Sequence, residues 1–268
     1  MPIHCPISFC RLSQEEFGRL DYQVMRHAFD CQNELGRLCD EVIYKNDLAA
    51  RLEAAGLGPV RREVPLVVTH EGFTKRYALD ATVGDRAIYE AKVAARLVEE
   101  HDAQGFNYLF LAGAERGKLL NFRPAQVESR FLNATVTPEE RRRFTVDTRR
   151  WQPLGDAGEK LKARLLALLA DWGGFLDLAL YTEALTWFLG GEQAVVRAVP
   201  LTRHGLPLGQ QRFHLLAPDV AFRLTALPED GAAAYEAQLR ALLRLSPLRA
   251  VQWINLPYHQ VQFVTLIK

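Results

Sequence analysis

Two carboxylates and an ammonium fall in a stretch with the composition of two neighbouring β-strands. Glu90 and Lys92 stand two residues apart in one strand-like run, so their side chains project from the same face of the strand. Asp80 lies late in the preceding strand-like run and can converge on that face. Two carboxylates suit a hard divalent cation, and the ammonium can orient or activate a water molecule. The spacing predicts a metal site, although a solvated strand face would carry the same residue types.

The segments around these residues predict a mixed sheet flanked by helices. A capping box at Ser13 and Glu16 opens the first helix, and glycine-containing turns at residues 71–72 and 84–85 separate three strands. The order α-α-β-β-β-α-β is not a regular βαβ series, so we expect an α/β fold with an α+β-like mixed sheet. The expected helices span residues 13–35, 40–55 and 98–112, the strands 60–69, 73–83, 86–93 and 118–122, and Pro124 opens a helical turn.

The second half of the chain repeats this order of elements. We expect helices over 159–172, 175–189 and 231–245, and strands over 194–202, 211–216, 220–224 and 250–256. The halves also align by residue: Gly36, Asp40 and Tyr44 match Gly173, Asp177 and Tyr181, and Asn121 matches Asn255. The pattern predicts a tandem duplication, with domains over 1–134 and 156–268.

The Arg-rich segment over residues 135–155 is predicted to join the two domains. It is polar and contains the runs Arg141-Arg142-Arg143 and Arg149-Arg150. Such a run is typical of a linker or a solvated helix face, and contact with phosphate is the alternative.

Composition excludes the disordered, fibrous and membrane-spanning classes. The 268 residues are 49% hydrophobic and 24% charged, an average composition for a soluble protein. No run of about 18 uncharged apolar residues occurs, and the N-terminus lacks the pattern of a signal peptide, so we expect a cytoplasmic protein. With 33 basic and 32 acidic residues the net charge is +1, which neither demands nor excludes a polyanionic partner.

All cysteines lie near the N-terminus, at Cys5, Cys10, Cys31 and Cys39. Their gaps match neither a zinc ribbon nor a zinc finger. In a cytosolic chain they are predicted to be reduced, partly buried thiols, with a metal or iron–sulfur site as the alternative.

Five motifs stand in a fixed order around the carboxylates. They are Glu34-Leu35-Gly36 followed by Glu41 and Tyr44, then Tyr77-Ala78-Leu79-Asp80, then Asp85 to Lys92, then His101-Asp102-Ala103-Gln104 with Tyr108, and finally Asn121-Phe122. This series, over about residues 20–130, resembles the core of the PD-(D/E)XK nuclease superfamily. More narrowly it resembles the GxxExxY proteins, a prokaryotic group within that superfamily. Leu38 stands where the signature has glycine, and the preceding Pro-Gly pair is absent, so the turn into the second helix is expected to differ.

The resemblance implies a restriction-endonuclease-like fold and a metal-dependent nuclease that hydrolyses phosphodiester bonds of nucleic acid, DNA more than RNA. It makes Asp80 and Glu90 metal ligands, and it makes Lys92 the residue that orients water or stabilises charge. Glu41 becomes a helix carboxylate that reaches the metal directly or through water, and Gln104 a polar support. The implied cofactor is Mg²⁺, with Mn²⁺ as a substitute. Such a site neutralises oxyanion charge and positions water for in-line attack.

A competing hypothesis is a non-catalytic nucleic-acid- or protein-binding module that keeps the nuclease fold. The near-neutral charge favours it slightly, because indiscriminate DNA binders carry more positive charge. The intact set of Asp80, Glu90 and Lys92 favours the enzyme. Glu41 could also be an exposed helix residue and His101 a capping histidine.

The second half lacks the acidic residues. Glu41 aligns with Leu178 and Asp80 with Leu216, and the segment aligned with Glu90 and Lys92, residues 220–225, contains no acid. Gln238 and Asn255 persist, but a lone glutamine does not bind magnesium. We expect a degenerate copy that packs on the first as an intramolecular pseudo-dimer or widens a nucleic-acid surface.

Overall fold

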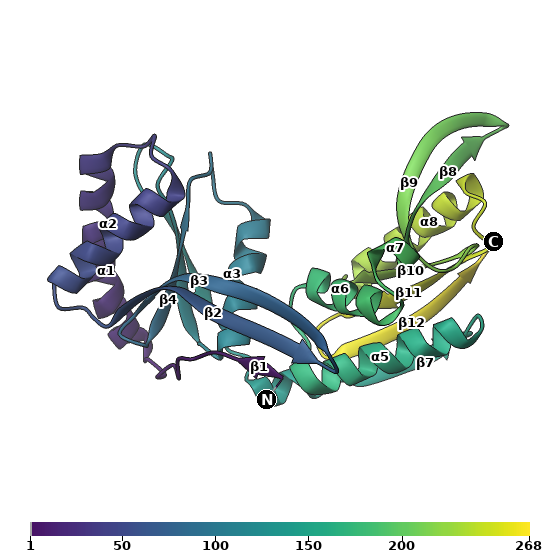
Figure 1. The fold of residues 1–268 in the computed structure, drawn as a ribbon, viewed down its shortest axis with the longest axis horizontal. Helices are drawn as coiled ribbons and strands as arrows, with labels where there is room; N and C mark the ends of the chain where they lie inside the picture. Colours follow the sequence, from purple (N-terminus) through teal and green to yellow (C-terminus); the bar gives the residue numbers. More distant parts are fainter. Residues whose placement is uncertain (1) are drawn as a thin grey trace. The chain divides into compact units, whose positions relative to one another are not determined.

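Residues 2–268 are described by a computed structural model, in which the strands form two separate six-stranded sheets. The chain divides into one unit that ends at Pro138 and another that spans Glu139–Lys268. Each unit holds one sheet with its own helices (Figure 1). The expected mixed α/β class with helices around mixed sheets is confirmed. Within these residues, no helix is long and apolar enough to span a bilayer.

The first sheet has its strands in sequential order, β1 to β6. Strands β4 and β5 are parallel and joined through α3, whereas every other neighbouring pair is antiparallel. The strands are β1 (Ile3–His4), β2 (Val60–His70), β3 (Phe73–Val83), β4 (Ala87–Lys92), β5 (Arg116–Asn121) and β6 (Glu128–Asn133). The helices are α1 (Gln14–Leu35), α2 (Glu41–Ala54) and α3 (Glu99–Ala112).

The core of the first unit lies between the α1–α2 pair and the sheet. Tyr44 of α2 is buried and stacks on Phe122, with ring centroids 4.7 Å apart. The Tyr44 hydroxyl donates to the carbonyl oxygen of Gly36 at 2.8 Å, which fixes the turn between the two helices. This anchor places the first turn of α2, with Glu41 and Lys45, above the sheet.

The second sheet has the order β7-β12-β11-β10-β9-β8. Strands β8 to β12 repeat the order and the directions of β2 to β6, including the parallel β10–β11 pair, while β7 adds a parallel edge strand. The strands are β7 (Thr145–Arg150), β8 (Val196–Arg203), β9 (Leu206–Ala217), β10 (Val220–Thr225), β11 (Ala250–Asn255) and β12 (Gln260–Ile267). The helices are α4 (Pro138–Arg141), α5 (Asp156–Trp172), α6 (Leu178–Phe188), α7 (Glu192–Val195) and α8 (Glu229–Leu245).

Both units preserve the same hydrogen bonds around one buried asparagine. Asn121 bonds to both the N–H and the C=O of Ala94 and also donates to Glu128. Asn255 bonds in the same way to the N–H and C=O of Leu227 and donates to Gln262. The tyrosine contact recurs too, since the Tyr181 hydroxyl donates to the carbonyl of Gly173.

Several edge strands differ from the sequence-based expectation. The helical turn predicted at Pro124 is wrong, because an irregular segment there leads into β6. Strands β1, β7 and β12 were not expected, and β9 begins at Leu206 rather than 211. β6 and β7 are polar edge strands with few buried side chains, so their sequences lack the apolar alternation that indicates a strand.

From Glu139 onward, the Arg-rich segment belongs to the second unit rather than to a free linker. Its centre forms β7, which pairs with β12. Arg141 is buried, and its guanidinium donates to the carbonyl oxygens of Trp172 at 3.1 Å and Gly174 at 3.3 Å. Burial lowers the pKa of Arg141 to about 10. The Arg141 guanidinium, which the sequence predicted to be exposed to solvent, is therefore hydrogen-bonded to backbone carbonyl oxygens instead.

Strand pairing also corrects the alignment of Asp80 with Leu216. The pairs that define the register are Ala81–Tyr89 in the first sheet and His214–Phe222 in the second. Asp80 directly precedes Ala81, and Phe213 directly precedes His214. Phe213 therefore stands at the position of Asp80. An irregularity between Val220 and Ala221 shifts the register, which residue counting along the sequence could not detect.

Candidate active site

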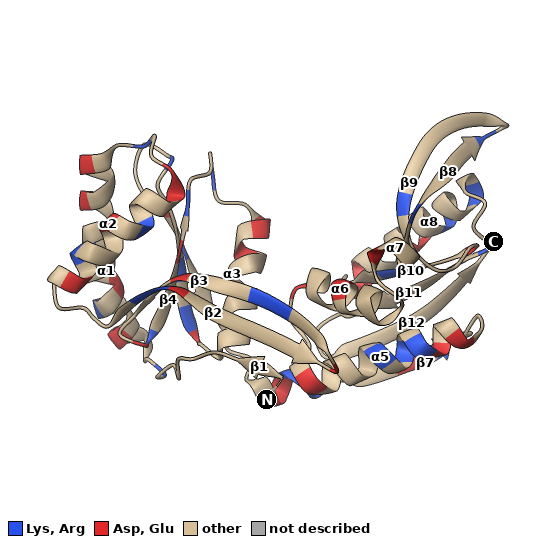
Figure 2. Cartoon of the chain, in the orientation of Figure 1, with Lys and Arg blue, Asp and Glu red and all other residues tan. Residues whose placement is uncertain are grey.

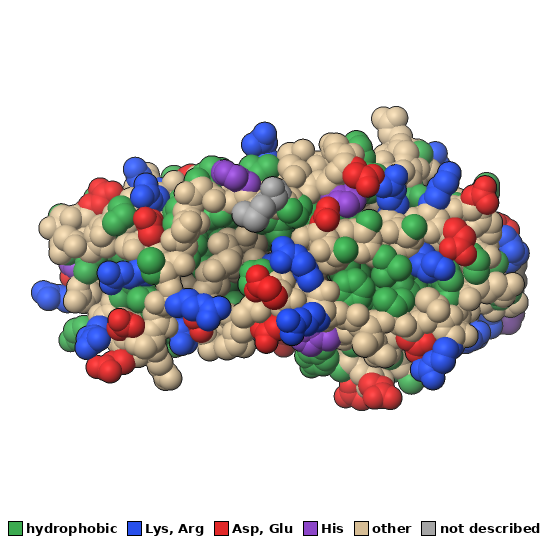
Figure 3. Space-filling model, turned by 90° about the horizontal axis from the view of Figure 1, so that it is seen from below, with side chains coloured by type: hydrophobic (Ala, Val, Ile, Leu, Met, Phe, Trp, Pro, Cys, Tyr) green, Lys and Arg blue, Asp and Glu red, His purple; other side chains and the backbone are tan. Residues whose placement is uncertain are grey.

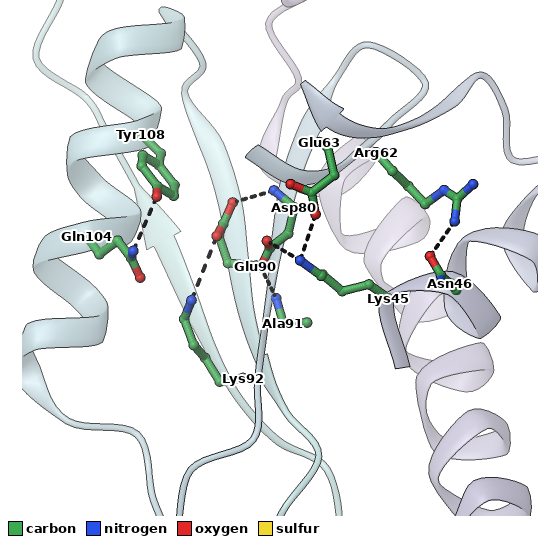
Figure 4. A network of polar contacts seen from close by, with 10 residues as sticks. All are labelled: Lys45, Asn46, Arg62, Glu63, Asp80, Glu90, Ala91, Lys92, Gln104 and Tyr108. Carbon is green, nitrogen blue, oxygen red and sulfur yellow. Dashed lines mark hydrogen bonds and ion pairs between the residues drawn. The ribbon is translucent and has the colours of Figure 1, made fainter. Parts of the chain in front are cut away.

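Asp80 of β3 and Glu90 of β4 hold each other in place across the two strands. Glu90 Oε1 accepts a hydrogen bond from the Asp80 backbone N–H at 3.1 Å, and Asp80 Oδ2 accepts one from the Ala91 backbone N–H at 3.0 Å. Lys92 Nζ lies 3.9 Å from Glu90 Oε2 (Figure 4). The structure thus brings Asp80, Glu90 and Lys92 together in a site fixed by backbone groups.

Burial dominates the electrostatics of this site. Asp80 is 8% exposed and Glu90 only 2% exposed. Burial raises the pKa of Glu90 well above its ordinary value, and the charge of Asp80 raises it further, while Lys92 opposes the shift. Burial is therefore the main reason that Glu90 holds its proton more tightly than an exposed glutamate does.

Lys45 supplies positive charge that the sequence analysis missed. Its Nζ donates to Asp80 Oδ1 at 3.0 Å and to Glu63 Oε1 at 2.7 Å. Burial alone would lower the pKa of Lys45, but the bonds to Glu63 and Asp80 outweigh it and raise the pKa. Lys45 follows Glu41 by four residues, so both lie on one face of α2, and this helical spacing was the available signal.

Glu41 lies near the site without joining its hydrogen-bonded centre. Burial raises the pKa of Glu41, with Lys92 and Asp80 as the nearest charged influences. Within residues 2–268, no three Asp, Glu, His or Cys side chains are grouped as ligands of one metal ion. Glu41 therefore interacts electrostatically with Asp80 and Lys92, and the described residues do not form a three-carboxylate cluster.

Gln104 borders the site from α3. Its Nε2 donates to the Tyr108 hydroxyl at 3.2 Å, and Figure 4 shows both side chains on the helix beside Glu90 and Lys92. Burial raises the pKa of Tyr108 to about 12, and the charge of Glu90 contributes. The phenol is therefore a neutral hydrogen-bonding group near the carboxylates.

Other motif residues have structural positions. His101 Nδ1 accepts a hydrogen bond from the Val98 backbone N–H at 3.1 Å and so caps α3. The four cysteines are free thiols, and Cys31 is buried beneath α2. Leu38, in place of the signature glycine, is exposed in the turn before α2.

The donor set fits a hard divalent cation. Carboxylate oxygens are the ligands that Mg²⁺ prefers, and Asp80 and Glu90 offer them from adjacent strands. Burial raises the pKa of Glu90 most and the charge of Asp80 raises it further, so a bound cation would favour the ionised form of this pair. Asp80 and Glu90 would hold the ion, with Glu41 within electrostatic reach.

With a net charge of +1, the protein has no large excess of positive charge. On the face seen in Figure 3, Lys and Arg side chains are interspersed with Asp and Glu. Local sites, rather than a broad positive field, must therefore account for any binding of a polyanion.

Comparison with known families shows that the region around these residues matches one family model. The family model of the PD-(D/E)XK nuclease superfamily matches residues 18–131, a stretch that contains Glu41, Asp80, Glu90 and Lys92. The mixed α/β architecture of that region is consistent with the restriction-endonuclease-like fold.

Two further comparisons complete this picture. A crystal structure of the protein SSO0001 is similar at 20% sequence identity and a TM-score of 0.27, over 42% of this chain. The match covers 65% of that protein's chain. No curated protein matches the chain.

Proposed function

We propose that the N-terminal unit is a divalent-metal-dependent nuclease that hydrolyses phosphodiester bonds of nucleic acid, with DNA as the preferred substrate. The observation that carries this proposal is the Asp80–Glu90–Lys92 set, held by backbone bonds on β3 and β4. Its location inside the stretch matched by the nuclease family model supports the same function. The ordered motifs from Glu34 to Phe122 support the narrower assignment to the GxxExxY proteins.

Each side chain has a distinct part in this reaction. A bound Mg²⁺ or Mn²⁺ would neutralise charge that develops on the phosphate. Asp80 and Glu90 would hold the ion, and their bonds to the backbone keep them oriented before substrate arrives. Lys92 orients the attacking water or stabilises the developing oxyanion.

The residues on the two neighbouring helices complete the site. Glu41 of α2 would contact the ion directly or through water, and Gln104 of α3 supports the site through Tyr108. Because Lys45 already bonds to Asp80, its ammonium must share that carboxylate with the incoming cation.

The decisive test is cleavage of single- and double-stranded DNA and RNA by the full chain with Mg²⁺ or Mn²⁺. The change Glu90→Gln should reduce the rate by a factor of about 10² to 10³, because it removes a metal ligand while keeping the side chain's shape. Arg244→Gln is a matched control, since Arg244 is exposed and has no polar partner among residues 2–268. Equal rates for the wild type and Glu90→Gln would contradict the assignment.

A non-catalytic binding module is the second candidate. The observation that favours it is the Lys45–Asp80 ion pair, because an ammonium already neutralises one proposed ligand. On this alternative the wild type binds nucleic acid but cleaves none of the four substrates with either metal. Any cleavage lost in Glu90→Gln rules the alternative out.

A further inference from the structure

The C-terminal unit contains cavities at the place that corresponds to the active site of the N-terminal unit. Arg223 stands at the position of Glu90, and Thr225 stands at the position of Lys92, because Lys92 pairs with Asn121 and Thr225 with Asn255. The positions equivalent to Glu41, Lys45, Asp80 and Gln104 are Leu178, Thr182, Phe213 and Gln238. Each charged residue of the first site is thus matched by an uncharged residue or by one of opposite charge.

These substituted positions line two adjoining cavities. One has a volume of about 450 Å³ and is lined by Leu178, Thr182, His214, Arg223 and Thr225, among others. The other has a volume of about 290 Å³ and is lined by residues that include Arg212, Phe213 and Gln238. Phe222, Arg223 and Tyr235 belong to both linings, so the two cavities adjoin along β10, and together they are called the cleft here.

The cleft is basic and has no acidic lining. Neither cavity is lined by Asp or Glu. Arg223 Nε donates to the Tyr235 hydroxyl at 3.1 Å, and no carboxylate of the described chain pairs with this guanidinium. Arg212 lies beside it on β9 and is paired with Glu192 at 2.7 Å. In Figure 2 the ribbon is blue at Lys and Arg positions, and such blue segments are visible on β9.

We propose that this cleft binds a phosphodiester of a nucleic-acid strand without hydrolysing it. A carboxylate site needs a metal ion to hold phosphate, whereas a guanidinium binds phosphate oxygens directly and in a forked geometry. The exchange of Glu90 for Arg223 therefore converts a metal-dependent contact into a direct one. Tyr235 fixes the Nε edge of the guanidinium and leaves its terminal nitrogens available.

The walls of the cleft indicate a strand rather than a free phosphate ion. Tyr235 provides partly exposed aromatic surface beside the guanidinium, and Phe213 and Phe222 lie buried below it. Bases stack on aromatic side chains next to a positively charged groove in proteins that bind single strands. Inorganic phosphate would use only the arginine and would leave this surface uncovered. The proposal does not require cleavage by the N-terminal unit.

The test is binding of a fluorescently labelled single-stranded DNA oligonucleotide to the full chain, measured by anisotropy with EDTA present. Arg223→Gln should weaken binding about tenfold, because a charged hydrogen bond to phosphate is lost. The slope of log K against log salt should fall by about 0.7 for the one lost contact. Arg244→Gln removes the same charge from an exposed position of α8 and should change neither quantity.

A second pair of measurements distinguishes the ligand and the two units. An excess of inorganic phosphate should not displace the oligonucleotide, and displacement would overturn the assignment to a strand. Equal losses in Arg223→Gln and Arg244→Gln, or no loss in Arg223→Gln, would also overturn the proposal. Because EDTA prevents metal-dependent cleavage, these outcomes are independent of whether Glu90→Gln abolishes hydrolysis. Circular dichroism of each variant verifies that the exposed substitution leaves the fold intact.

Discussion

The two units share one architecture but not one chemistry. Both have five consecutive strands of the same order and direction, and both have the buried asparagine and the tyrosine–glycine contact. At the strand positions of Glu90 and Lys92, however, the second unit has Arg223 and Thr225. Residues that satisfy the backbone are retained in both units, whereas those suited to metal chemistry occur in one.

The other face of the first sheet shows that the difference extends beyond the candidate active site. Asp21 and Lys118 form a buried ion pair at 2.6 Å, and Tyr89 lies close enough for the charge of Asp21 to raise its pKa, after burial as the main cause. Lys118 Nζ also lies 4.0 Å from the Phe131 ring centroid. The first unit therefore carries a second, structural set of charges.

The second unit replaces this set with uncharged residues. Gln252 pairs with Phe222 as Lys118 pairs with Tyr89, and Gly158 aligns with Asp21. A Cβ built on Gly158 would lie 2.7 Å from Gln252 Oε1, so the glutamine takes the space of the missing carboxylate. The contrast predicts that a substitution of Lys118 destabilises the first unit far more than a substitution of Gln252 destabilises the second.

Lys118→Met should have the largest effect on stability. It leaves Asp21 as a buried, unpaired carboxylate, which should destabilise the first unit by about 3–5 kcal/mol. Urea unfolding of the full chain measures the loss, and hydrogen exchange shows which unit loosens. The matched change Gln252→Met removes no charge and should cost less.

The double variant Asp21→Leu with Lys118→Met distinguishes a buried charge from poor packing. When both charges are removed, most of the lost stability should return, because neither partner is left unpaired. Equal stability of the double variant and Lys118→Met would show that the loss comes from packing, and the proposed contrast between the units would fail.

Asn121→Ala and Asn255→Ala should have equal effects in the two units. Each asparagine is fully buried and bonds to both backbone groups of the residue it faces, Ala94 or Leu227. Removing the amide leaves those groups unsatisfied and should cost about 2–3 kcal/mol in either unit. Hydrogen exchange should show loosening confined to the unit that carries the change. A loss in only one unit would show that the shared bonds are not energetically equivalent.

The central elements of both units could be predicted from sequence because their signals are local. The capping box at Ser13 and the apolar alternation of the central strands depend only on nearby residues. Edge strands such as β6 and β7 could not be found, because few of their side chains are buried and pairing with a neighbour defines them. The register of β9 against β10 could not be predicted either, because an irregularity in their pairing shifts which residues face each other.

The candidate site was predicted in part, for the same physical reason. Strand parity alone places Glu90 and Lys92 on one face, and the pairing of β3 with β4 brings Asp80 to them. Lys45 comes from a helix far away in sequence, and its bond to Asp80 depends on how α2 packs. The spacing from Glu41 indicates the helix face on which Lys45 lies, but the contact with Asp80 could not be predicted from it.

The smallest effect is expected from Tyr44→Phe and Tyr181→Phe. Each hydroxyl donates to the carbonyl of a glycine that ends the preceding helix, Gly36 or Gly173, and both glycines have a positive φ. Losing one hydroxyl should cost about 1 kcal/mol, because the ring still fills its place while the carbonyl loses a donor. The two changes share no partner, so their costs should add in the double variant, as measured by urea unfolding. A cost for Tyr44→Phe well above that for Tyr181→Phe would mean that the turn before α2, which positions Glu41 and Lys45, depends on this bond more than its counterpart does.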